Sequence, residues 1–459
     1  MTTRVAVVGG GLAGIAAALR CADAGREVTL FEARPRLGGL THSFRRGDLD
    51  VDNGQHVFLR CCTAYRALLD RLAVTDQVAL QPRLDVPVLS PGGRRPARLR
   101  RGRLPAPLHL GGSVLRYGPL SLAERARFAR AALALRRVDP DAPASDTRTF
   151  GDWLAAHGQD ERAVTALWDL VGVATLNARA AEASLALAAT VFQVGLLTEA
   201  DAADIGWSMV PLGRLHGEAA AGRLAAAGAR VRTGAKVTAL APSGAAWLVA
   251  AGGEEHAVDQ VVVAVPPVAA ADLLPPGCPP LPDGWSRRLG SSPIVNVHVV
   301  YDRKVLDEPF VAGVDTPVQW VFDRTAQSGL AEGQYVAVSL SAAHDRIGRP
   351  TAELREEMLP ALAELLPAAR RATVRDFFVT REREATFRPA PGQAALRPPP
   401  GRVADGLYPG LYLAGAWTAT GWPATMESAV RSGDAAAEAL LADTTPAPAT
   451  IREPVGEAR

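Results

Sequence analysis

The first forty residues restrict the fold more than any other stretch of the chain. Residues 4–8, Arg-Val-Ala-Val-Val, form a short, mostly apolar run that is typical of a buried parallel strand. Residues 9–14, Gly-Gly-Gly-Leu-Ala-Gly, follow it, and residues 15–24 predict an alanine-rich helix that Gly25 ends. Residues 26–31 predict a second strand, which is followed by Glu32. This order of elements predicts a βαβ unit.

The glycines of this unit have separate tasks. One permits the tight turn, one lets the backbone approach a pyrophosphate, and one lets the helix pack close to the strand. The helix N-terminus offers free N–H groups and a partial positive charge to phosphates. An acid about 20 residues downstream is placed to accept a ribose hydroxyl. We therefore predict a dinucleotide site formed by Gly9, Gly11, Leu12, Ala13, Gly14 and Glu32.

Length and composition exclude several classes of protein. A chain of 459 residues can bury a large core and is long for one domain. A net charge of +2 implies no general nucleic-acid role. The strand begins by Arg4, which leaves no room for a signal peptide, and no apolar run of about 18 residues predicts a transmembrane helix. We expect a cytoplasmic protein without a metal site, since its four cysteines lack the spacing of metal ligands.

The residues after the second strand carry a resemblance. The sequence Glu32-Ala33-Arg34 and the pair Gly38-Gly39 resemble the extended fingerprint of FAD enzymes in the amine oxidase and carotenoid desaturase superfamily. The resemblance implies FAD as the cofactor, with Glu32 at the adenosine ribose and Arg34 and the glycine pair along the diphosphate and flavin. The other contacts that it implies are Ala33, Leu40, Val237 (by its backbone, at the adenine), Gly415, Ala416, Thr425 and Met426.

A polar cluster, Asp52-Asn53-Gly54-Gln55-His56, follows a hairpin expected across residues 45–48. Beside a flavin, Asn53, Gly54, Gln55 and His56 would contact the cofactor or the substrate; solvation of a loop is the alternative. His56 is the one imidazole of the cluster that can exchange protons near neutral pH. We predict that His56, held by Asn53 or Gln55, is a catalytic acid. Glu427 is the second candidate, and its alternative role is a charge that a helix dipole stabilises.

The resemblance also implies the fold class and its division. We expect an α/β protein in which a Rossmann-like FAD-binding domain (GR2-type flavoprotein) is interleaved with an α+β substrate domain. The FAD-binding domain would comprise residues 1–80, 205–272 and 400–442, and the substrate domain residues 81–204 and 273–399. Residues 443–459, rich in Pro, Thr, Ala and Glu, predict a disordered tail.

Residues 94–117 combine a strongly basic stretch with an apolar one. Arg94, Arg95, Arg98, Arg100, Arg101 and Arg103 precede Leu104-Pro105-Ala106-Pro107-Leu108-His109-Leu110 and Leu115-Arg116-Tyr117. Such a segment can bind an anionic membrane surface, which would place the protein peripherally at the inner face of the membrane. A solvated basic loop is the alternative.

Three positions argue against amine oxidation. Superfamily members often carry an acid where this chain has Ala416, and amine oxidases place a Tyr where it has Thr425. They also tend to carry a Lys on the strand at residues 294–301, where this chain has Asn296, and a neutral amide cannot assist proton transfer as a lysine can.

The chain resembles more closely the squalene-associated flavoproteins of hopanoid biosynthesis, the hydroxysqualene dehydroxylases. The matching stretches are residues 52–59, 293–298, 417–421, 423–425 and 429–433. The resemblance implies an isoprenoid substrate, hydroxysqualene, whose hydroxyl is removed reductively with reduced FAD to give squalene. A carotenoid or phytoene desaturase and a non-catalytic flavin-binding isoprenoid carrier are the alternatives. The electron donor is unknown, since no second GxGxxG fingerprint follows a strand.

Overall fold

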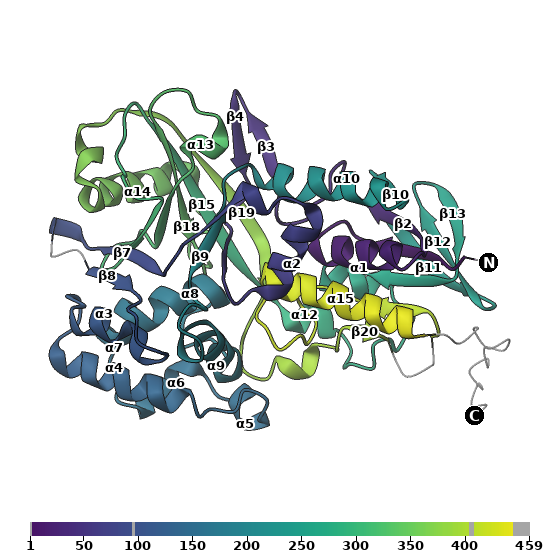
Figure 1. Ribbon diagram of the computed structural model, residues 1–459, viewed down its shortest axis with the longest axis horizontal. Helices are drawn as coiled ribbons and strands as arrows, with labels where there is room; N and C mark the ends of the chain where they lie inside the picture. Colours follow the sequence, from purple (N-terminus) through teal and green to yellow (C-terminus); the bar gives the residue numbers. More distant parts are fainter. Residues whose placement is uncertain (1, 94–96, 404–407, 444–459) are drawn as a thin grey trace.

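The computed structural model describes residues 2–93, 97–403 and 408–443. It contains two large sheets and a group of helices (Figure 1). The predicted tail, apart from Asp443, lies outside the described residues, as do Arg94 and Arg95 of the basic stretch.

The first sheet has six strands and contains the predicted βαβ unit. Five neighbouring strands are parallel, and the sixth, β20, is an antiparallel edge strand. In spatial order the strands are β10 (Arg230–Thr233), β2 (Glu27–Glu32), β1 (Arg4–Val8), β14 (Gln260–Val263), β21 (Leu411–Leu413) and β20 (Gly401–Arg402). This doubly covered parallel sheet confirms the Rossmann-like α/β fold class.

The two faces of this sheet are covered differently. Helices α1 (Leu12–Asp23) and α15 (Met426–Ala442) lie side by side on one face, and α10 (Ala219–Ala226) packs beside them (Figure 1). The meander of β11 (Val237–Ser243), β12 (Ala246–Ala251) and β13 (Glu254–Val258) covers the other face, where Trp247 and Val249 share a core with strand residues. Burial on both faces explains why β1 and β14 are almost entirely apolar.

The second sheet has seven strands and lies at the upper left in Figure 1. Its order is β19 (Val374–Phe387), β15 (Ser291–Tyr301), β18 (Gln334–Leu340), β17 (Trp320–Asp323), β16 (Phe310–Gly313), β7 (Asp85–Leu89) and β8 (Ala97–Arg100). Helix α14 (Thr351–Leu365) buries Leu354, Met358 and Leu362 in the core of this sheet. These strands come from the segments assigned to the substrate domain and those of the first sheet from the segments assigned to the FAD-binding domain; the exact division stays a prediction.

The basic stretch is not the loop that its composition suggested. Strand β8 pairs with β7, and Arg98 and Arg100 form ion pairs with Asp85, at 3.0 and 3.1 Å. Arg101 binds the buried Asp204 at 2.7 Å. These arginines thus pair with carboxylates of the protein itself.

Short elements complete the structure. The hairpin expected at residues 45–48 is present as β3 (Ser43–Arg46) and β4 (Leu49–Asp52). A small sheet contains β5 (Val57–Leu59), β9 (Ile205–Ser208) and β6 (Val78–Leu80). The remaining α-helices are α2 (Thr63–Leu72), α3 (Gly111–Leu115), α4 (Leu122–Leu135), α5 (Pro143–Asp146), α6 (Phe150–Ala156), α7 (Glu161–Ala163), α8 (Asp169–Leu176), α9 (Leu185–Phe192), α11 (Pro267–Leu273), α12 (Trp285–Leu289) and α13 (Thr325–Ser328). Within the described ranges, none of the helices has the length and apolar character needed to cross a bilayer.

Candidate active site

The glycines of the first turn are required by close backbone contacts. Gly9 has a φ of +108°, and a Cβ there would lie 2.5 Å from the carbonyl oxygen of Ala264. A Cβ on Gly14 would lie 1.8 Å from the carbonyl oxygen of Gly9, so only glycine lets α1 approach β1 this closely. At Gly11 the nearest atom to a Cβ is 3.9 Å away, which leaves its backbone open to a ligand. No side chain caps α1, and its first N–H groups therefore face the same opening.

Glu32 is fixed at the end of β2 beside this opening. It is 9% exposed, and its carboxylate accepts hydrogen bonds from the backbone N–H of Gly10 and of Arg34, both at 2.7 Å. The carbonyl oxygens of Glu32 and Arg34 accept hydrogen bonds from Ala235 and Gly234, each at 2.9 Å, which brings the start of β11 and Val237 alongside. The predicted FAD contacts Glu32, Ala33, Arg34 and Val237 are thus brought together.

A second stretch of backbone lies against the first turn. The N–H of Gly38 donates to the carbonyl oxygen of Gly10 at 2.8 Å, and a Cβ on Gly39 would lie 2.9 Å from Gly11 Cα. Gly39 must therefore lack a side chain to lie beside the phosphate-binding turn. These close approaches, together with the open backbone at Gly11, fit the extended dinucleotide that FAD contains.

The C-terminal predicted contacts form a second helix N-terminus near the first. Gly415 has a φ of +144°, and its N–H donates to Ser432 Oγ at 2.8 Å. The carbonyl oxygen of Ala416 accepts a hydrogen bond from Ser428 Oγ at 3.1 Å. Thr425 caps α15 by accepting a hydrogen bond from the Ser428 N–H at 3.2 Å, which places Met426 in the first turn. Helix α15 crosses α1 closely, as the contacts between their residues show.

Asn53 ties three segments together. Its side-chain NH₂ donates to the carbonyl oxygen of Leu40 at 2.8 Å and to Glu382 on β19 at 3.0 Å. Its side-chain oxygen accepts a hydrogen bond from the His42 N–H at 3.1 Å. These three bonds occupy the Asn53 amide and none of them reaches His56, so a role for Asn53 in holding the ring stays a prediction.

His56 instead contacts Gly54, whose carbonyl oxygen lies 3.2 Å from His56 Nδ1. The adjacent Gln55 does not hold the ring either; its buried Nε2 has no hydrogen-bond partner among the described residues. A side chain at Gly54 would lie 3.5 Å from His56 Cε1 and 3.3 Å from Asn296 Nδ2, so the imidazole and this buried amide flank one glycine. Burial lowers the pKa of His56, and nearby Asp52 opposes that effect. The ring is therefore largely neutral near pH 7.

Glu427 has a structural role. It is 1% exposed, and its carboxylate accepts hydrogen bonds from the N–H groups of Ala64 and Tyr65, at 3.1 and 2.7 Å, and from Arg431 Nε at 2.7 Å. Both oxygens thus bind donors, two of them at the N-terminus of α2. These contacts agree with the alternative of a structural role at a helix terminus, and the role of Glu427 as an acid stays a prediction.

The sequence analysis missed a buried ion pair that fixes the polar cluster. Asp52 and Arg324 are both buried, and their side chains meet at 2.5 Å. Asp52 also accepts hydrogen bonds from Ser43 Oγ at 2.6 Å and from the Leu212 N–H at 2.9 Å. Arg324 follows β17, so the pair joins the seven-stranded sheet to the β3–β4 hairpin directly before the loop that carries His56. A separation of 272 residues leaves no local sequence signal for this contact.

Buried histidines make the folded protein sensitive to acid. Burial lowers the pKa of His216 and of His298 to about 3. Between the ordinary value of 6.5 and pH 3, the unfolded chain binds protons that the folded chain does not, so stability falls as the pH falls. We expect the free energy of unfolding to decrease by on the order of 2 kcal/mol per pH unit below pH 6. Urea unfolding at pH 7, 6, 5 and 4 checks this.

His298→Gln separates this effect from general acid denaturation. His298 binds Tyr335 Oη at 2.7 Å and Thr380 Oγ1 at 2.9 Å, and glutamine can replace part of this bonding. The variant should be less stable at pH 7 but lose less stability between pH 6 and pH 4. An unchanged slope would contradict the assignment.

Comparison with known proteins agrees with this geometry. Residues 12–441 match the family model described as flavin containing amine oxidoreductase. The hydroxysqualene dehydroxylase of Rhodopseudomonas palustris is 30% identical over 96% of this chain and 99% of that protein. The zeta-carotene desaturase of Zea mays is 32% identical, but only over 37% of this chain and 31% of that protein.

Among solved structures, a putrescine oxidase with putrescine bound has a TM-score of 0.72. It is 20% identical in sequence, and the match covers 96% of this chain and 99% of that one, which confirms the fold. With the match to the family model over residues 12–441, and with a backbone cradle that fits FAD, the chain belongs to the flavin-containing amine oxidoreductase family and is an FAD-dependent oxidoreductase.

Proposed function

We propose that this protein removes the hydroxyl of hydroxysqualene reductively and releases squalene and water. The similarity to a hydroxysqualene dehydroxylase along nearly the whole of both chains carries the proposal. Three positions that argue against amine oxidation also support it, namely Asn296, Ala416 and Thr425.

The reaction sets three requirements for the site. The substrate hydroxyl is allylic, so its loss as water leaves a delocalised cation, and an acid must protonate the leaving oxygen. Bound in its reduced form, FAD supplies a hydride from N5. The cation also requires an apolar wall without competing nucleophiles.

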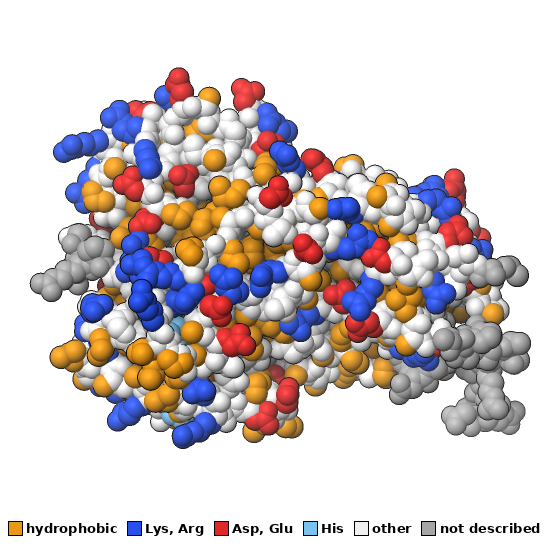
Figure 2. Space-filling view, in the orientation of Figure 1, with side chains coloured by type: hydrophobic (Ala, Val, Ile, Leu, Met, Phe, Trp, Pro, Cys, Tyr) orange, Lys and Arg blue, Asp and Glu red, His pale blue; other side chains and the backbone are white. Residues whose placement is uncertain are grey.

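We assign the proton donor to His56. Its ring lies at Gly54, next to the buried Asn296, in the loop that Asn53 fastens to the backbone of Leu40. Gln55 Nε2, which has no hydrogen-bond partner among the described residues, is a donor that can orient the departing water. The apolar wall is assigned to partly buried side chains around β5 and β9, namely Leu59, Leu196 and Trp207. Figure 2 shows apolar side chains gathered over this region of the visible face.

The proposal is tested under anaerobic conditions. The purified holoenzyme is reduced with dithionite, and hydroxysqualene is added. The expected result is the return of the absorption of oxidised flavin together with the formation of squalene. Flavin that stays reduced would contradict the proposal.

The same experiment tests a carotenoid desaturase, which the partial similarity to zeta-carotene desaturase favours as the second candidate. A desaturase would transfer electrons from phytoene-type polyenes to the oxidised flavin. Flavin that no donor reduces and no substrate oxidises would favour the third candidate, a non-catalytic flavin-binding isoprenoid carrier. The electron donor is proposed to be a partner or a free reductant that reaches the flavin directly.

We further propose that an apolar patch beside β8 binds the membrane in which the isoprenoid substrate dissolves. The patch comprises Leu104, Leu108 and Leu115, which are 58%, 58% and 67% exposed, and it includes the exposed Arg103 and Arg116. Figure 2 shows apolar side chains over α3 and α4, below a band of basic ones. Exposed leucines beside arginines suit the interface of an anionic bilayer.

Replacing Leu108 and Leu115 together by Glu should reduce binding to anionic vesicles at least about tenfold, since each leucine contributes roughly 1.5–3 kcal/mol when buried. Co-sedimentation with phosphatidylglycerol vesicles measures this. Val268→Glu, at a 38% exposed position on α11, is the matched control and should bind as the unchanged protein does. Equal binding by both variants would contradict the patch.

A further inference from the structure

Arg397 is a buried arginine that binds the loop between β21 and α15. It is 8% exposed and follows the short helix η8 (Ala394–Leu396). Its Nε donates to the carbonyl oxygen of Trp417 at 3.1 Å. Its Nη2 donates to those of Thr418 and Trp422, at 2.6 and 2.9 Å. All three acceptors are backbone oxygens of one loop.

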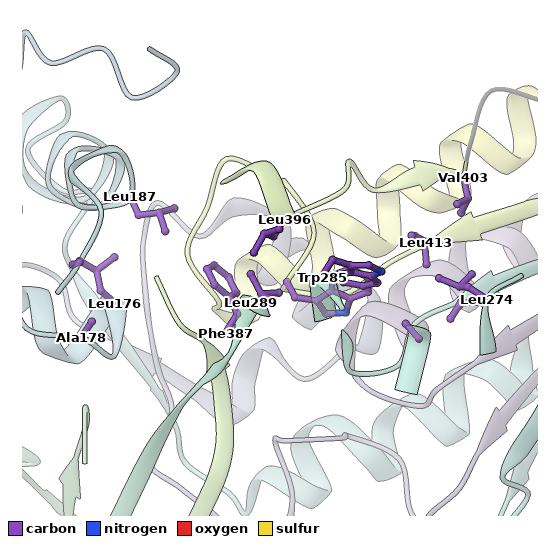
Figure 3. Close-up of a cluster of buried hydrophobic side chains, with 14 of the residues drawn as sticks. Leu176, Ala178, Leu187, Leu274, Trp285, Leu289, Phe387, Leu396, Val403 and Leu413 are labelled. Atoms are coloured by element: carbon purple, nitrogen blue, oxygen red, sulfur yellow. The ribbon is translucent and has the colours of Figure 1, made fainter. Parts of the chain in front are cut away.

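The surroundings of this guanidinium are apolar. It lies 4.4 Å from the centre of the Phe387 ring, and Figure 3 shows Phe387 beside Leu289 and Leu396 in one apolar cluster. No carboxylate of the described residues forms an ion pair with Arg397 within 4 Å, although the charge of Asp146 acts on it. Burial lowers the pKa of Arg397 to about 10, which keeps it charged near pH 7.

A buried charge without a paired countercharge is costly. Arg324, the other buried arginine near the site, is paired with Asp52. Arg397 differs from Arg324 because backbone carbonyl oxygens hold its charge and no carboxylate within the described ranges neutralises it, so the charge can act on a charged ligand nearby. Its acceptors Thr418 and Trp422 lie two residues after Ala416 and three before Thr425, which are both predicted FAD contacts. Arg397 thus binds the loop that lies between these two predicted contacts.

We propose that Arg397 is a positioning residue whose charge favours the anionic form of reduced FAD and so raises the midpoint potential of the cofactor. Two electrons and one proton convert neutral oxidised flavin to the anionic reduced form. A nearby cation disfavours uptake of the second proton. Because its environment is apolar, the charge of Arg397 is poorly screened and can act on the cofactor across the loop. The proposal rests on FAD binding and not on the identity of the substrate.

The test compares holoenzymes that carry Arg397→Met, Arg397→Lys and the control Arg388→Met, which removes an exposed arginine of the same segment. Midpoint potentials are measured anaerobically against a reference dye, and absorbance spectra of the reduced flavin are recorded across pH. In Arg397→Met the potential should become more negative, because the preference for reduced over oxidised FAD falls on the order of tenfold. Arg397→Lys keeps the charge and should stay close to the unchanged protein, as should Arg388→Met.

An Arg397→Met variant that binds FAD with an unchanged midpoint potential would overturn the proposal. Arg397 would then have only the structural role of holding the loop between β21 and α15. If that variant does not fold, the absorbance spectrum of the reduced flavin in the unchanged holoenzyme tests the proposal. Neutral reduced flavin at a pH where free reduced flavin is already anionic would also overturn the proposal. Squalene formation is not a readout, so failure of the proposed substrate would leave this result unaffected.

Discussion

Replacing Gly14 with alanine should abolish FAD binding and destabilise the protein by about 3 kcal/mol or more. The added Cβ would lie 1.8 Å from the carbonyl oxygen of Gly9, so α1 must move away from β1. That movement displaces the helix N-terminus that is assigned to the phosphates. Flavin content after purification and urea unfolding of the apoprotein measure the two effects.

Two further alanine substitutions separate packing from ligand contact. At Gly11 a Cβ meets no atom within 3.9 Å, so Gly11→Ala should fold normally and weaken FAD binding alone, as a methyl group enters the space assigned to the pyrophosphate. Full flavin content in Gly11→Ala would contradict the assigned phosphate position.

At Gly222, in α10, a Cβ meets nothing within 4 Å, and alanine should stabilise the protein by about 0.5–1 kcal/mol.

The cofactor site could be predicted from the sequence because its residues are local or carry a known motif. The turn at Gly9 to Gly14 and the acid Glu32 were predicted from their spacing, and the pair Gly38-Gly39 from the family resemblance. The capping box of α4, formed by Ser121 and Glu124, was predictable for the same reason.

The second sheet could be predicted only in part. Strand β15 alternates clearly, but β19 carries Arg375, Arg381 and Arg383, which hide its strand pattern. Strands β7 and β8 were obscured by prolines and arginines, whose partner Asp85 becomes apparent only when the strands pair.

The geometry of the candidate active site depends on contacts between distant residues. Asn53 binds Glu382, Asp52 binds Arg324, and Glu427 caps α2 through Ala64 and Tyr65. None of these pairs has a local signal. The residue types were found in the sequence, but the tertiary structure decides which side chains stay available for chemistry.

His56→Gln should lower the rate of hydroxysqualene-dependent flavin reoxidation by about 10²–10⁴-fold while FAD stays bound. His56 is the proton donor assigned to the leaving oxygen, whereas glutamine keeps a hydrogen-bonding group of similar size and cannot donate a proton. Single-turnover reoxidation of the dithionite-reduced holoenzyme measures the step. His256→Gln, on β13, is the matched control and should react at the unchanged rate.

The pH dependence distinguishes an acid from a residue that only packs against the substrate. Because burial lowers the pKa of His56, the protonated fraction is small at pH 7 and grows as the pH falls below its ordinary value near 6.5. The reoxidation rate should therefore rise toward acid pH in the unchanged protein, and this rise should be absent in His56→Gln. The buried His216 and His298 lower stability over the same range, so rates are compared only where circular dichroism shows folded protein. Full turnover by His56→Gln, or an identical acid limb in both proteins, would assign the proton to another donor.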